Sequence, residues 1–205
     1  MDIVEIFAIL HREQLLIDHT SHSEQFHGLT EGLLRACTAA AVIPALSATE
    51  IQLYSGLALL HDIGKRAIPP EVLNKPGLLT KAEFEIMKTH TIQGCMLVEQ
   101  ISELRESKVF PLICDVCRHH HERWDGSGYP DQLVGGSITP WVHVVGLVDA
   151  FDALVHPRIY KPAFSVEQAK SMILSGACGA FDPRLLSCFA RNISAISQAA
   201  YAITG

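Results

Sequence analysis

Long hydrophobic runs are missing from the 205 residues, and no apolar stretch approaches the ~18 residues that a membrane-spanning helix needs. The first five residues, Met1 to Glu5, also lack the basic start of a secretory signal peptide. Both absences predict a cytoplasmic protein with no membrane partner. Six cysteines are too few for a disulfide scaffold, so we expect reduced and mostly buried thiols.

Positive charge is also scarce. The 16 Lys and Arg residues against 22 Asp and Glu give a formal net charge of −6, which argues against a partner that is a nucleic-acid polymer bound through bulk charge. A local cluster of cations can still hold a small anionic ligand. Histidine is abundant by contrast, and 11 imidazoles in a chain of this size usually have a chemical reason.

Helix start signals recur along the chain, and strand signals are rare. Four positions carry a residue suited to cap a helix: Ser47, Thr80, Ser165 and Asp182. The first predicted helix continues to about Gly64 and the second to about Ser102. Segment 141–148 would also suit a strand, but we expect a helix because no other strand-like run can pair with it. We predict a single all-α domain over residues 1–205.

Most of the histidines lie in four clusters along the chain. Asp18 and His22 are one helical turn apart, so both could reach the same metal ion. His61-Asp62 ends an apolar helix, where an imidazole and a carboxylate can ligate together and the carboxylate can bridge two ions. Lys65 follows one turn later, and its ammonium is placed for a phosphate oxygen.

Several other histidine, cysteine and acidic side chains can be explained by structural roles. His119 is the first of three consecutive histidines and points away from at least one neighbour on a helix, so we do not expect it to be a ligand. Cys114 and Cys117 form a C-x-x-C, but without a second pair we interpret them as buried structural thiols. Glu122 and Asp152 could orient a ligating imidazole or act structurally.

The ordered motifs of the chain resemble the signature of the HD-GYP domain, a subgroup of the HD metal-dependent phosphohydrolases. The motifs that carry the resemblance are His61-Asp62-Ile63-Gly64-Lys65, Asn74-Lys75-Pro76-Gly77, His90, the segment from His120 to Pro130 with Gly128-Tyr129-Pro130, the run from Val148 to Leu154, and the segments 158–162 and 181–183. An HD dipeptide alone has little value, whereas this ordered set is highly specific.

The resemblance implies an HD-type helical bundle that encloses iron or manganese ions and hydrolyses cyclic dinucleotides, above all cyclic di-GMP. The implied metal ligands are His22, His61, Asp62, His90, His120, His121 and Asp149, with Asp62 as the bridging and catalytic carboxylate. Lys65 would hold or polarise the scissile phosphate. Arg158 and Lys161 would meet the ligand's phosphates, and Tyr129 would lie beside the site.

Two departures from the family pattern matter. Members with three metal ions commonly have Glu where this chain has Asp18, which is shorter, so we expect two ions and treat Asp18 as an additional candidate ligand for a third. Gln25-Phe26 replaces the usual Arg-Val, so His19 and His27 rival His22. Members also carry a sensory domain before this one, and we expect the input signal to be missing or to come from another chain.

The resulting prediction is a phosphodiesterase in which a metal-activated hydroxide opens cyclic di-GMP to linear pGpG, GMP or both. Two alternatives stay open. One is a non-catalytic metal- or dinucleotide-binding scaffold that acts through the GYP loop, for example on a diguanylate cyclase (GGDEF) domain. The other is an HD hydrolase of another nucleotide, including the mixed cyclic GMP-AMP dinucleotide.

Overall fold

The computed structural model describes residues 1–15, 21–157 and 162–202. Within them the secondary structure is helical, and the one β pairing is a single bridge between Asp125 and Val134. In chain order the elements are α1 (Ile3–Arg12), α2 (Ser21–Ala39), α3 (Ala48–Ala58), η1 (Ile63–Ala67), α4 (Pro70–Leu73), α5 (Lys81–Lys88), α6 (His90–Glu99), α7 (Ser102–Arg105), α8 (Phe110–His119), η2 (Gly135–Ser137), α9 (Pro140–Val155), α10 (Val166–Leu174) and α11 (Pro183–Ala202). The predicted all-α fold is confirmed.

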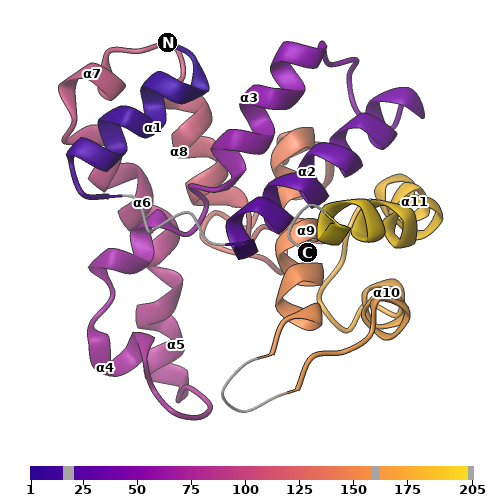
Figure 1. Cartoon of the computed structure of the whole chain (residues 1–205). Helices are drawn as coiled ribbons and strands as arrows, with labels where there is room; N and C mark the ends of the chain where they lie inside the picture. Colours follow the sequence, from indigo (N-terminus) through magenta and orange to yellow (C-terminus); the bar gives the residue numbers. More distant parts are fainter. Residues whose placement is uncertain (16–20, 158–161, 203–205) are drawn as a thin grey trace.

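Helix α9 is the buried centre of the bundle. It begins with Pro140 at its first position, where the missing N–H costs nothing, and most of its side chains are inaccessible to solvent. Figure 1 shows α9 between the elements of the first half of the chain and the pair α10 and α11. The helix expected over 141–148 is therefore confirmed, and burial on all sides explains its nearly continuous apolar sequence.

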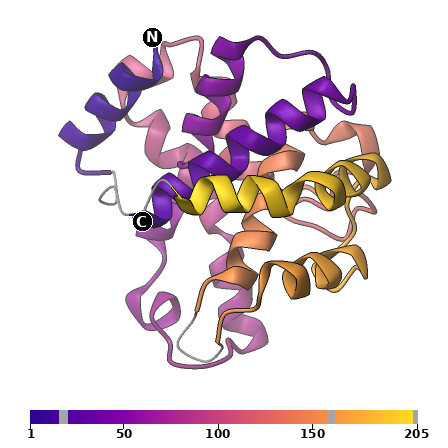
Figure 2. The same ribbon diagram turned by 45° about the vertical axis from the view of Figure 1, so that its right-hand side comes forward.

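Two long helices cover one side of this core. Helix α11 packs along α2, and both views show the two side by side (Figures 1 and 2). Close approach is possible because Gly28 and Gly32 of α2 face Ala200 and Ile196 of α11. In the described part of the chain, no helix is long and apolar enough to span a bilayer.

The predicted starts of the helices are confirmed, but two predicted helices are shorter. Capping boxes at Ser47, Thr80 and Ser165 begin α3, α5 and α10. The first helix ends at Ala58 rather than near Gly64, because its last turn tightens to bonds between residues three apart, including Leu60 N to Leu57 O at 2.9 Å.

The second predicted helix is interrupted after Lys88. Three consecutive side chains bind the carbonyl oxygen three residues earlier: Thr89 Oγ1 binds Ile86, His90 Nδ1 binds Met87 and Thr91 Oγ1 binds Lys88, at 2.7, 2.7 and 2.9 Å. These bonds compete with the backbone ladder of a continuous helix. The break leaves His90 at the start of α6.

The expectation of reduced thiols is wrong for one pair. Cys95 of α6 and Cys114 of α8 form a disulfide, with their Cα atoms 4.6 Å apart. The pairing depends on the packing of α6 against α8, which the spacing of cysteines along the chain does not reveal. Cys117 is a buried thiol as expected and donates to Leu60 O at 3.2 Å.

Candidate metal centre

The HD dipeptide lies in the tight turn between α3 and η1. His61 Nδ1 contacts Ala58 O at 2.7 Å, so the ring is held by the end of the helix that precedes it. His90 Nδ1 contacts Met87 O at 2.7 Å, and His120 Nδ1 contacts Val116 O at 2.9 Å. A carbonyl oxygen can only accept, so each Nδ1 carries a proton. In a neutral ring, Nε2 then offers its lone pair, as in a metal-ligating histidine.

The Nε2 atoms of these three rings converge on one carboxylate. His61 Nε2 lies 3.3 Å from Asp62 Oδ2, and His90 Nε2 lies 3.4 Å from Asp62 Oδ1. His120 Nε2 lies 3.9 Å from the same Oδ1. One potential ligand atom from each of Asp62, His90, His120 and His121 lies within 4.8 Å of the others.

Two features of this group fit a bound cation. Asp62 Oδ1 is buried and has no hydrogen-bond partner among the described residues, an arrangement that costs about 1–3 kcal/mol unless something compensates. The Nε2 atoms of His90 and His120 are 3.3 Å apart, about the separation of two ligands that share one ion at about 2.1 Å. Imidazole with carboxylate suits several divalent transition metals, so the residues fit the predicted group.

The electrostatics of the cluster favour neutral His120 and His121 rings and a protonated His61 beside an ionised Asp62 carboxylate. Burial lowers the pKa of His120 and His121 well below the usual range, and the neighbouring imidazoles add to the effect. Burial opposes ionisation of Asp62, but His61 and Lys65 outweigh it and hold its pKa well below the usual range. Burial likewise opposes protonation of His61, yet the Asp62 carboxylate raises the pKa of His61 to about 9.

Asp149 of α9 lies beside the same group of imidazoles. Its Oδ1 lies 3.7 Å from His61 Nε2, and its Oδ2 lies 3.9 Å from His121 Nδ1. Burial raises the pKa of Asp149, with the Asp62 charge also raising it. A cation between Asp62 and Asp149 would stabilise both carboxylates, so the second carboxylate adds to the fit.

The segments that carry the predicted ligands are held together by close backbone contacts. These contacts leave no room for a side chain. A Cβ on Gly64 would lie 1.9 Å from His90 O, and a Cβ on Gly146 would lie 2.3 Å from His120 O. Neither neighbour can shift cheaply, because both are backbone atoms. Glycine is therefore required where η1 crosses the start of α6 and where α9 crosses the end of α8.

The predicted substrate-side residues border the cluster. Lys65 Nζ donates to Asp62 Oδ2, and the Tyr129 ring stacks on His121 with the centroids 4.7 Å apart. Glu122 is buried, and its carboxylate accepts hydrogen bonds from Asp131 N and Leu133 N at 2.7 and 2.9 Å. Glu122 therefore fixes the loop that follows the GYP segment, which is the structural alternative for this residue.

Not every predicted ligand joins the group around Asp62. His22 Nε2 instead lies 2.8 Å from Asp152 Oδ2, and His156 Nδ1 lies 3.2 Å from Asp152 Oδ1. The rival His27 contacts Ser55 Oγ at 3.1 Å. Asp18, His19, Arg158 and Lys161 lie outside the described residues. The role of His22 as a ligand stays a prediction.

His156 and Arg123 make contacts near the cluster that we did not predict from the sequence. Asp152 lies in the last turn of α9 and His156 is its C-cap residue, four positions later, and this spacing was a usable signal. Arg123 is held by Cys178 O at 3.2 Å and His120 O at 3.3 Å, and its guanidinium lies 4.8 Å from the Phe181 ring centroid. His119 binds Asp115 and Asp131 through its two ring nitrogens, in line with the expectation that it is not a ligand.

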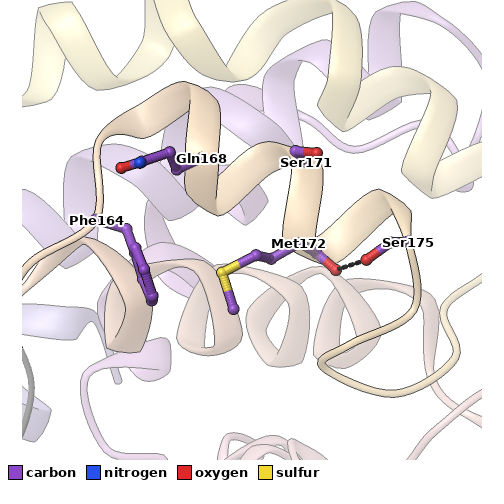
Figure 3. A pocket seen from close by; sticks show the side chains of 5 residues that line it. All are labelled: Phe164, Gln168, Ser171, Met172 and Ser175. Carbon is purple, nitrogen blue, oxygen red and sulfur yellow. Dashed lines mark hydrogen bonds between the residues drawn. The ribbon is translucent and has the colours of Figure 1, made fainter.

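A shallow pocket on α10 is a separate feature. Its volume is about 340 Å³, and it is lined by Phe164, Gln168, Ser171, Met172 and Ser175. Figure 3 shows these side chains, with Ser175 Oγ donating to the carbonyl of Met172. No lining residue is acidic, basic or a histidine, so this pocket lacks the groups that could bind a metal ion or a phosphate.

Three comparisons relate the chain to known proteins. Residues 11–185 match the family model described as HD domain. A "Cyclic di-GMP phosphodiesterase" of Vibrio cholerae is 42% identical over 146 residues, and a "3'3'-cGAMP-specific phosphodiesterase 2" of the same organism is 32% identical over 150 residues. These alignments cover 70% and 73% of this chain but 30% and 28% of the relatives.

A similar solved structure supports the fold. An HDG"Y"P protein from Bdellovibrio bacteriovorus superposes with a TM-score of 0.60 at 18% sequence identity. The match covers 87% of this chain and 55% of that structure.

Proposed function

Because the chain belongs to the HD domain family, we propose that it is a metal-dependent phosphodiesterase that hydrolyses cyclic di-GMP. Its predicted place in the HD-GYP subgroup is confirmed. The observation that carries the proposal is the convergence of the His61, His90 and His120 Nε2 atoms on Asp62. The curated relatives are named as phosphodiesterases of cyclic dinucleotides, which supports the substrate class.

The proposed centre holds two metal ions, iron or manganese. We assign their ligands as a set: His22, His61, Asp62, His90, His120, His121 and Asp149. Asp62 is the bridging carboxylate, because its two oxygens face different imidazoles. Asp18 is an additional candidate ligand, for a third ion. When bound, the ions lower the pKa of water toward neutrality and offset the charge that develops on the phosphoryl oxygens.

The protein's own residues orient the substrate and fix the ligands. The backbone carbonyls of Ala58, Met87 and Val116 hold protons on the Nδ1 atoms, so Nε2 is the atom of each ring that is left to bind a cation. Lys65 stands beside Asp62, where its ammonium can bind a non-bridging oxygen of the scissile phosphate. Tyr129 borders the substrate against His121. Arg158 and Lys161 complete the proposed phosphate contacts.

The proposed setting is bacterial second-messenger signalling in the cytoplasm. The end product is linear pGpG, GMP or both, and a diguanylate cyclase (GGDEF) domain is the proposed protein partner of the GYP loop. The exposed Asp125 and Ser127 just before Tyr129 are compatible with such a contact. Co-purification of the partner should be lost when both residues are replaced by alanine, and unchanged co-purification would refute this contact.

The experiment that tests the activity is anaerobic turnover by protein loaded separately with ferrous iron and with manganese. Cyclic di-GMP and the mixed cyclic GMP-AMP dinucleotide are each supplied, and products are resolved by chromatography. We expect pGpG or GMP from cyclic di-GMP with at least one metal. Faster turnover of the mixed dinucleotide would favour the second candidate function, which the cGAMP-specific relative suggests. No product from metal-loaded protein would favour the binding scaffold.

A further inference from the structure

A partly exposed aromatic ring stands at the edge of the proposed metal centre. Phe84 lies on α5, and 45% of its surface is accessible to solvent, which is high for a large apolar side chain. Its ring meets the Tyr129 ring edge-on, with the centroids 6.2 Å apart and an interplanar angle of 82°. Tyr129 in turn stacks on His121. A continuous row of rings therefore leads from a predicted metal ligand to the surface.

A cation accompanies the exposed ring. Lys88 Nζ lies 5.6 Å from the Phe84 centroid and 5.7 Å from the Tyr129 centroid. Its ion-pair partner is Glu85, at 2.7 Å. Helix α5 is fixed at its start by the capping box of Thr80 and Glu83, and Lys75 contacts Glu83 at 2.6 Å. The ring and the cation are thus held on a defined element.

We infer that Phe84 and Lys88 form the site for one purine base of the substrate, with Phe84 as the stacking surface and Lys88 as the guanine-selective donor. The inference rests on the proposed function. The ring centroids are 4.7 Å apart from His121 to Tyr129 and 6.2 Å apart from Tyr129 to Phe84, so Phe84 lies two ring contacts away from a predicted metal ligand. Exposed aromatic rings commonly bind bases by stacking.

Lys88 gives this site its selectivity. Guanine offers the acceptors O6 and N7 on one edge, which suit an ammonium donor, whereas adenine places the N6 amino donor there. A lysine beside a stacked base therefore favours guanine. The chemistry predicts that the chain prefers cyclic di-GMP to cyclic di-AMP through Lys88, because the mixed dinucleotide still carries one guanine that can occupy the site.

The test uses the metal-loaded full chain and four variants: Phe84→Ala, Phe84→Trp, Lys88→Gln and Ile86→Ala. Ile86 is the matched control, because it is 39% exposed on the same helix but is turned about 200° away from Phe84. Affinity for cyclic di-GMP is measured by calorimetry under non-turnover conditions. KM and kcat are measured for cyclic di-GMP, for cyclic di-AMP, which lacks guanine, and for bis(p-nitrophenyl) phosphate, a diester without a base.

Loss of a stacking partner weakens base binding by about 5- to 150-fold. We expect Phe84→Ala to raise Kd and KM for cyclic di-GMP within that range, with Phe84→Trp restoring them and Ile86→Ala changing them less than twofold. The defect should be confined to the substrates that carry bases. Lys88→Gln should reduce the preference for cyclic di-GMP over cyclic di-AMP at least fivefold.

Three results would overturn the inference. These are an unchanged Kd in Phe84→Ala, an equal effect of Ile86→Ala, and an equal loss on the base-free diester. Failure of the proposed function looks different, because the unaltered chain would then turn over none of the three diesters. The calorimetric comparison still decides the base site in that case, since absent or unchanged binding refutes it and Phe84-dependent binding supports it.

Discussion

Replacement of His143 by phenylalanine should remove a defined part of the acid sensitivity of the fold. His143 is 4% exposed and lies between the rings of Trp124 and Phe181, at centroid distances of 5.7 and 5.5 Å. Its Nε2 is buried without a hydrogen-bond partner among the described residues. Burial is the main cause that lowers the pKa of His143 to about 4, with Asp182 opposing the shift and Arg123 adding to it.

The sign of the effect follows from proton binding. Between pH 4 and 6.5 the unfolded chain binds a proton at this histidine and the folded chain does not, so stability rises with pH across this window. The contribution is fully present above pH 6.5 and is lost as the pH falls toward 4. A change from 6.5 to about 4 corresponds to roughly 3 kcal/mol in full, of which about 2 kcal/mol is lost at pH 5.

The assay is denaturant unfolding of the parent chain and of His143→Phe at pH 7.5, 6 and 5. Phenylalanine keeps an aromatic ring between Trp124 and Phe181 and cannot be protonated. We expect the parent to lose about 2 kcal/mol relative to the variant between pH 7.5 and 5. A stability difference that stays constant within about 0.5 kcal/mol over this range would refute the reasoning.

Three further predictions concern the proposed metal centre and the structure that supports it. Lys65→Ala should retain bound metal while kcat falls by about 10²–10³-fold, because one charged donor to the phosphate is lost; metal loss measured by elemental analysis would contradict its assigned role. Cys95→Ser should lower Tm by about 6–12 °C without reductant, because a cross-link over this spacing contributes about 3 kcal/mol. Reductant should then lower only the parent's Tm, and six reactive thiols in the denatured, unreduced parent would refute the bridge. Gly64→Ala should fail to retain metal or fold, because its Cβ would collide with His90 O; normal metal content with an unchanged Tm would show that the backbone can yield there.

Local sequence signals predicted well where the helices of the molecule begin. The capping boxes at Ser47, Thr80 and Ser165 depend on residues three apart, so the sequence alone identifies them. Helix α9 followed from its apolar run together with the absence of a second strand. The ordered HD, His90 and His120-His121 motifs predicted a group that the fold brings within 4.8 Å around Asp62.

Features that depend on tertiary packing could not be predicted from the sequence. The Cys95–Cys114 bridge requires α6 and α8 to pack side by side, and the chain spacing of 19 residues does not reveal this. The break after Lys88 depends on side chains that bind carbonyl oxygens rather than on a proline or glycine signal. His22 faces Asp152 instead of Asp62, a choice that periodicity along one helix cannot decide.

Counting bound metal ions tests the central claim most directly. The parent chain and Asp62→Asn are loaded anaerobically with ferrous iron or manganese, desalted and analysed for metal per chain, with Ile86→Ala as the control. We predict two ions in the parent and the control, and loss of at least one in Asp62→Asn, since Asp62 is the carboxylate on which the imidazoles converge. An equal metal content in the parent and Asp62→Asn would contradict the account.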